Sequence, residues 1–159
     1  MKYNSVLCDT SFFIRLLDRS DPLHHNARGY FKYFIEKEYS LLISTIAIAE
    51  YCIVGDLHEL PLRNLQIIPF NLDHAKRTAD FARVVFQNKG KLKIRERNII
   101  PNDTKLFAQA DLTKGSCFYL SSDTESFKIY NLLRQELNLK FQFIDLTTPY
   151  GDTFGILNF

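Results

Sequence analysis

Short apolar runs alternate with longer segments of helical periodicity along most of the chain. Runs with the length and composition of buried strands lie at residues 5–8, 41–44, 67–70, 116–120 and 141–146. Apolar side chains recur at helical spacing in the intervening segments 12–18, 21–37, 45–53, 71–88, 103–113 and 124–137. Strands that alternate with helices predict an α/β fold with a mainly parallel central sheet and right-handed crossovers.

The bulk composition is that of a globular protein with one domain. The chain has 159 residues, of which 46% are hydrophobic and 24% are charged, so residues 1–159 are expected to form a single domain with a substantial core. No run approaches the roughly 18 apolar residues of a membrane span, and the N-terminus lacks a signal-peptide pattern. The odd cysteine count favours reduced thiols. Together these features predict a cytoplasmic protein.

A net charge of +2 neither demands nor excludes a nucleic-acid partner, so any such surface must be local. The densest group of cations consists of Lys89, Lys91, Lys93, Arg95 and Arg97. If the segment is extended, alternation places these side chains on one face. The segment is then either a phosphate-contacting arm or a solvated hairpin.

Further candidates for RNA contact lie elsewhere in the chain. Lys105 could bind phosphate, or it could be an exposed or ion-paired lysine. Tyr30, Tyr33 and Tyr39 could stack on bases, although their helical spacing favours a place in the core.

Four acids stand at positions where a parallel sheet collects ligands. Asp9 ends the first strand and Asp123 follows the strand at 116–120, and ligands bind beyond the carboxyl ends of such strands. Asp103 opens a helix. Each of these aspartates could instead be a helix cap. Glu50 is harder to explain structurally, because it lies among apolar residues, where an unpartnered carboxylate is costly.

Four carboxylates near one crevice would repel one another unless a cation neutralised them. Oxygen ligands suit hard cations, so Mg²⁺ or Mn²⁺ is the expected cofactor. Such an ion can orient a nucleophilic water and stabilise charge on a phosphate.

The acids lie in segments that resemble the four acidic motifs of PIN domains. In order, the segments are VLCDTS (6–11), STIAIAE (44–50), NDTKLFAQA (102–110) and YLSSDTESF (119–127). The resemblance spans residues 6–146 and rests on the ordered set of motifs. It implies a three-layer α/β/α fold and a Mg²⁺- or Mn²⁺-dependent ribonuclease that leaves 5′-phosphate and 3′-hydroxyl ends.

The resemblance also implies roles for particular residues. Those expected to bind metal and catalyse cleavage are Asp9, Glu50, Asp103 and Asp123. Ser11 and Ser121 match small polar residues that support the site. The chain departs from the family pattern after the fourth acid, where Phe127 is present and only Glu125 could substitute for a further acid.

By size, the chain is most similar to the toxin nucleases of bacterial type II toxin–antitoxin pairs, the virulence-associated protein C class. That likeness implies a homodimer, an RNA substrate and a small antitoxin partner. A housekeeping RNA-processing nuclease and a non-catalytic PIN module that binds RNA or protein are alternatives. A haloacid-dehalogenase-type phosphatase fits less well, because it needs an acid where Ser11 stands.

Overall fold

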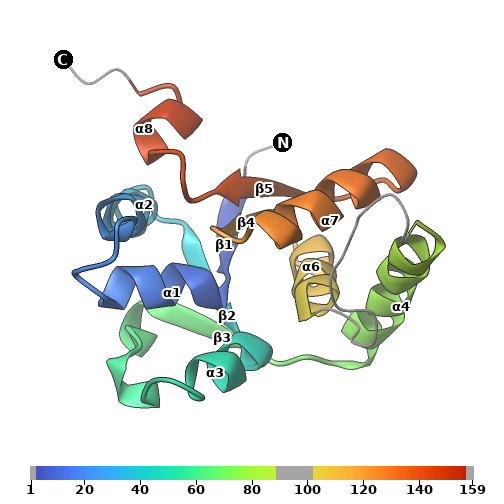
Figure 1. The fold of residues 1–159 in the computed structure, drawn as a ribbon, viewed down its shortest axis with the longest axis horizontal. Helices are drawn as coiled ribbons and strands as arrows, with labels where there is room; N and C mark the ends of the chain where they lie inside the picture. The colour runs from blue at the N-terminus through green and yellow to red at the C-terminus, as the bar shows by residue number, and fades with distance from the viewer. Residues whose placement is uncertain (1–2, 89–101, 157–159) are drawn as a thin grey trace.

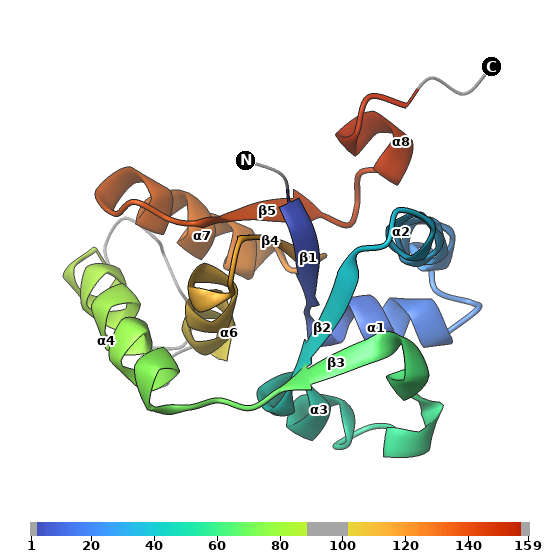
Figure 2. The same cartoon turned by 180° about the vertical axis from the view of Figure 1, so that it is seen from behind.

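The computed structural model describes residues 3–88 and 102–156 and contains a single five-stranded sheet (Figures 1 and 2). In chain order the strands are β1 (Tyr3–Cys8), β2 (Ser40–Ser44), β3 (Leu65–Ile68), β4 (Ser116–Ser121) and β5 (Phe141–Asp145). Their spatial order is β3-β2-β1-β4-β5, and every pairing is parallel. The chain therefore builds outward from β1 on one side and later returns to its other side, which makes the gap between β1 and β4 the topological switch point.

Helices cover both faces of the sheet (Figure 1). They are α1 (Thr10–Leu17), α2 (His24–Glu36), α3 (Thr45–Tyr51), α4 (Leu72–Gln87), α6 (Asn102–Leu112), α7 (Thr124–Glu136) and α8 (Tyr150–Thr153), with short 3-10 turns at Leu57–Glu59 and Leu62–Asn64. One core cluster joins one sheet face to α1, α2 and α3, and a second joins the opposite face to α4, α6 and α7. This confirms the predicted α/β fold with its parallel sheet.

The alternation of strand side chains explains the two cores. In β1, Val6 and Cys8 point into the first cluster, whereas Leu7 points into the second. All three side chains are fully buried. Successive strand residues therefore contact different helical layers, as expected for a parallel strand that is covered on both faces.

Several element boundaries differ from the predicted ones. The third strand ends at Ile68 rather than running to Phe70, because Pro69 has no N–H with which to extend the ladder. The second helix begins at His24, since the Asp21 carboxylate accepts a hydrogen bond from the Leu23 N–H and forms a turn. Helix α3 ends at Tyr51 rather than at Ile53, and its N-cap is Ser44, whose side chain accepts a hydrogen bond from the Ile46 N–H.

The C-terminal segment packs back onto α2. The ring of Phe154 stacks on Tyr33 with centroids 4.5 Å apart, and the Tyr30 hydroxyl donates to the Thr148 carbonyl at 2.7 Å. Tyr30, Tyr33 and Tyr39 all belong to this aromatic core. Their predicted core role is thus confirmed, and the alternative of base stacking is wrong for Tyr30, which is fully buried.

All three cysteines are free. Cys8 and Cys117 are buried as small apolar side chains, whereas Cys52 is exposed. Across residues 3–88 and 102–156, no helix combines the length and apolar character needed to cross a bilayer.

Candidate active site

The site lies where β1 and β4 end side by side. Cys8 is in register with Leu120, and the Asp9 N–H continues the ladder by donating to the Leu120 carbonyl at 3.0 Å. Asp9 therefore emerges at the switch point, next to Ser121, the last residue of β4. The adjacency of these strands meets the condition under which the sequence predicted that Asp9 and Asp123 would converge.

Two serine hydroxyls hold the buried carboxylate of Asp9. Its Oδ2 accepts hydrogen bonds from Ser11 Oγ at 2.9 Å and from Ser121 Oγ at 2.8 Å. Burial raises the pKa of Asp9; the two serine hydrogen bonds lower it, and the nearby Glu50 raises it again. Asp9 is only 6% exposed, and among the described residues no cation is one of the partners that set its pKa.

Both oxygens of Glu50 are occupied by donors from other segments. Thr10 Oγ1 donates to Glu50 Oε2 at 2.6 Å, and the Asn102 side-chain amide donates to Glu50 Oε1 in a short hydrogen bond. Lys105 Nζ in turn donates to Asn102 Oδ1 at 3.2 Å. These contacts offset the cost of placing a carboxylate on an otherwise apolar stretch of helix. They also link Lys105 to the acids through one amide.

Asp103 has a strongly raised pKa. It lies in the first turn of α6, and Ser126 Oγ of α7 donates to its Oδ1 at 2.6 Å. Burial raises the pKa of Asp103 to about 7, and the charges of Asp9, Asp123 and Glu50 contribute to that rise. The structure therefore brings the four acids within electrostatic range of one another.

Asp123 acts as the N-cap of α7 as well as being part of this group. Its Oδ1 accepts from the Glu125 N–H at 2.8 Å, and its own N–H donates to Ser121 Oγ at 3.0 Å. Asp123 is exposed, so it lies at the mouth of the site. Glu125 forms an ion pair with Lys128 at 3.0 Å on the surface of α7.

The donor chemistry of this group fits a hard divalent cation. The site offers carboxylate oxygens, and the second oxygens of Asp103 and Asp123 accept no hydrogen bond from any described residue. As they lie, no three acidic, histidine or cysteine side chains among residues 3–88 and 102–156 are grouped closely enough to hold a metal ion. Each carboxylate instead accepts hydrogen bonds from hydroxyl or amide donors.

Arg15 is a cation at the edge of the site that the sequence did not single out. Its Nε donates to Ser122 Oγ at 2.8 Å, and its NH1 forms a salt bridge with Asp21 at 2.9 Å. The predicted contacts Lys91, Lys93, Arg95 and Arg97 fall outside the described residues.

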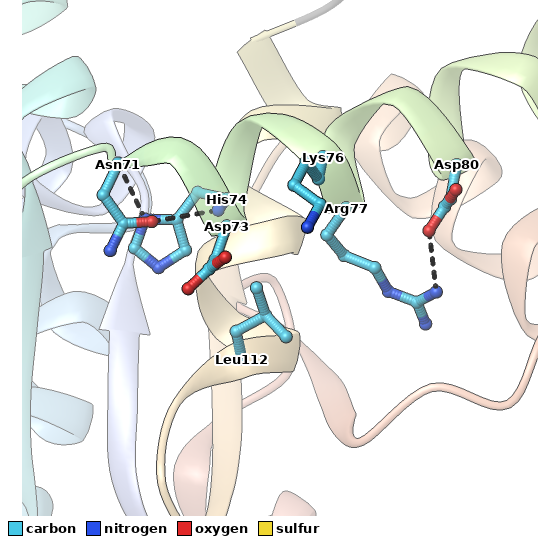
Figure 3. A pocket seen from close by; sticks show the side chains of 7 residues that line it. All are labelled: Asn71, Asp73, His74, Lys76, Arg77, Asp80 and Leu112. Carbon is cyan, nitrogen blue, oxygen red and sulfur yellow. Dashed lines mark hydrogen bonds and ion pairs between the residues drawn. The ribbon is translucent and has the colours of Figure 1, made fainter.

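A separate hollow lies along α4 (Figure 3), and none of the four acids lines it. Its volume is about 430 Å³, and the residues that line it are Asn71, Asp73, His74, Lys76, Arg77, Asp80 and Leu112. Within it, Arg77 and Asp80 form an ion pair at 3.5 Å. Opposite charges compensate one another here, which distinguishes this hollow from the acidic cluster.

Sequence reasoning missed the side chains that orient the acids. Thr10 and Asn102 each adjoin a predicted acid, and Ser126 lies one turn into the helix after Asp123. The one feature of the sequence that could have identified these residues is their position close to a predicted acid. Their polar character alone did not distinguish them from helix caps or surface residues.

The fold is shared with chains of two solved toxin–antitoxin structures. One is VapBC2 from Rickettsia felis bound to a DNA fragment from its promoter, with a TM-score of 0.60 and 15% sequence identity over 89% of this chain and 99% of that chain. The other is DNA-bound VapBC from Salmonella typhimurium, with a TM-score of 0.56 and 14% identity over 89% and 98%. No protein-family model and no curated protein matches the sequence. The likeness confirms the PIN-type fold that the four motifs predicted.

Proposed function

We propose that this protein is a divalent-metal-dependent ribonuclease in which Asp9, Glu50, Asp103 and Asp123 hold Mg²⁺ or Mn²⁺. The observation that carries the proposal is that the four acids gather beyond the adjacent ends of β1 and β4, close enough for their charges to act on Asp103. Its pKa is raised to about 7 by burial and by the three other acids. A divalent cation would favour the ionised carboxyl and relieve the repulsion within the group.

Each residue of the site has a part in this proposal. Ser11 and Ser121 fix the Asp9 carboxylate, while Thr10 and Asn102 fix Glu50. These donors limit the rotation of the acids and so prepare the arrangement that a cation would complete. When bound, the cation would polarise a phosphate and lower the pKa of water at the site.

RNA is the proposed substrate, with phosphate contacts from Lys105 and from the predicted basic arm Lys91, Lys93, Arg95 and Arg97. Lys105 is connected to Glu50 through Asn102, so a phosphate held by its ammonium would lie beside the acids. The arm is proposed from its charge and from its position immediately before Asp103 in the sequence.

The structural likeness to VapBC chains supports a more specific assignment within this function. We propose that the chain is the toxin of a toxin–antitoxin pair, that it forms a homodimer and that a small antitoxin inhibits it. Co-expression with the product of an adjacent small reading frame should give a stable complex in which RNA cleavage is suppressed. A free, active monomer under the same conditions would favour a housekeeping nuclease.

The test of the nuclease is cleavage of a mixed pool of single-stranded and structured RNA, with Mn²⁺, Mg²⁺ or EDTA. Cleavage should require the cation and should be lost in Asp9→Asn, because the substitution removes a charge from the ion's ligands. Asp73→Asn is the matched control, since Asp73 is also an aspartate in a first helical turn but lies in the α4 hollow. Its cleavage rate should equal that of wild type.

Two results would count against the proposal. Cleavage that survives EDTA or Asp9→Asn would mean that the acids do not supply the reaction. A folded protein that binds RNA but cuts none of the pool with either cation would favour the non-catalytic module.

A further inference from the structure

The phenol of Tyr119 is buried under the acidic cluster. Tyr119 is in β4 and is 0% exposed. Its ring packs against Phe107 with centroids 4.8 Å apart and against Phe143 at 5.5 Å. Its hydroxyl makes no hydrogen bond with any described residue. A buried hydroxyl without a partner is unfavourable, so the ring's packing alone does not explain why tyrosine stands here.

The strand register places this ring beneath the acids. Tyr119 is paired with Leu7 on β1, and side chains two residues apart share a sheet face. Asp9 and Ser121 therefore follow Leu7 and Tyr119 on the face that Tyr119 occupies. On α6, Asp103 precedes Phe107 by four residues, so the two lie on one helix face. The ring that packs against Phe107 thus lies one turn below Asp103.

The pKa of the Tyr119 hydroxyl also indicates that it lies near the four acids. Burial raises the pKa of Tyr119 well above its ordinary value, and Asp9, Asp103, Glu50 and Asp123 each raise it further. The phenol therefore stays protonated at any working pH and can only donate to these carboxylates. All four acids of the candidate site act on this one oxygen.

Phenylalanine would fill the same space without an unpartnered oxygen. The neighbouring positions of this core that contact the ring, including Phe107, Phe141 and Phe143, are phenylalanines. The hydroxyl of Tyr119 therefore adds a polar atom to a contact in which these three neighbouring rings are apolar.

We propose that Tyr119 is a positioning residue for the metal site. Its hydroxyl donates a hydrogen bond to the carboxylates of Asp9 or Asp103, directly or through one buried water, when the cluster is ionised around a divalent cation. This inference rests on the metal-dependent function proposed above. The hydroxyl would then be satisfied only in the metal-bound state, which favours that state over the metal-free one.

The experiment compares wild type, Tyr119→Phe and Tyr130→Phe in two measurements: Mn²⁺ affinity by calorimetry and thermal unfolding without metal. We expect Tyr119→Phe to bind Mn²⁺ about tenfold more weakly, as is usual when an outer partner of a metal ligand is lost. Without metal its Tm should not fall and should rise by about 2–4 °C, because the unpartnered oxygen is gone.

Tyr130→Phe is the matched control. Tyr130 packs against Phe141 and Phe143 in the same cluster, with centroids 5.3 Å and 5.5 Å away. Loss of its hydroxyl should leave Mn²⁺ affinity unchanged, since the residue is on α7 and, among the described residues, no hydrogen bond joins it to an acid.

The outcomes separate this inference from the proposed function. If wild type binds Mn²⁺ and Tyr119→Phe binds it equally tightly, the inference is wrong and the metal site stands. A lower Tm for metal-free Tyr119→Phe would also overturn it, because the hydroxyl would then have a structural partner. If wild type binds no Mn²⁺, the proposed function fails, and this inference fails with it.

Discussion

Helix α6 carries an acid near each end, and the two have opposite surroundings. Asp111, near the C-terminal end, is 2% exposed; it forms a salt bridge with Arg77 Nε at 2.8 Å and accepts from the Lys140 N–H at 2.6 Å. Asp103, in the first turn, has the Ser126 hydroxyl as its hydrogen-bond partner and three other acids within electrostatic range.

Asp111 therefore stabilises the fold, whereas ionised Asp103 destabilises it. The Arg77 guanidinium neutralises Asp111, and the pair ties α6 to α4. No described cation contacts Asp103, so its ionised form is unfavourable in the free protein. A buried acid that lacks a counter-charge is expected at a functional site, where a ligand supplies the missing charge.

The sharpest test of this contrast exchanges each acid for its amide. Asp103→Asn should lower RNA cleavage on the order of a thousandfold, the scale of losing a key electrostatic group, and should leave the fold stable. Asp111→Asn should lower the free energy of unfolding while the folded fraction still cleaves. Cleavage assays and urea titrations on both variants check this. If both variants lowered cleavage equally, Asp103 and Asp111 would not have the different roles proposed for them.

Removing the counter-charge of Asp111 should have the next largest effect. Arg77→Met leaves the Asp111 carboxylate buried and unpaired, so we expect a loss of about 3 kcal/mol in the free energy of unfolding. Lys76→Met, at the exposed neighbouring position, should change it by less than about 0.5 kcal/mol. Chemical denaturation measures both. A small effect of Arg77→Met would mean that water compensates Asp111.

The titration of Asp103 should make the free energy of unfolding depend on pH. Its folded pKa of about 7 lies above the ordinary 3.8, so between about pH 4 and 7 the unfolded chain releases a proton that the folded protein retains. Stability without divalent ions should therefore fall as the pH rises through this window, on the order of 4 kcal/mol. Asp103→Asn should remove that part of the slope. An unchanged slope would place the titration elsewhere.

The smallest predicted effect concerns the hydroxyl that contacts Asp103. Ser126→Ala removes a hydrogen bond to the carboxylate, which should weaken Mn²⁺ binding about threefold to tenfold. Ser20→Ala removes a comparable bond to Asp18 on the surface and serves as the control. Calorimetric titration compares them, and identical Mn²⁺ affinities would show that Ser126 does not tune the site.

The positions of the acids and the fold could be predicted from the sequence, because both depend on the order of neighbouring residues along the chain. Asp9 follows a short apolar strand, and Asp103 opens a helix. The ordered motifs also indicated the fold, and with it the neighbouring β1 and β4 that the site needs.

The rest depends on contacts between distant residues that no local pattern encodes. Ser126 meets Asp103 across two helices, and Asn102 meets Glu50 across 52 positions of sequence. Arg77 and Asp111 looked like ordinary helix residues, and Tyr119 looked like one more apolar position in a strand. Side-chain partners of this kind follow from packing between layers, which periodicity does not specify.

We propose that the acidic cluster, and not another group of acids, holds a divalent cation. Anomalous diffraction at the manganese edge from crystals soaked in Mn²⁺ would locate the ion. We expect a peak bounded by the carboxylates of Asp9, Asp103 and their two acidic neighbours. A peak only in the α4 hollow beside Asp73 and Asp80, or no peak at the cluster, would contradict it.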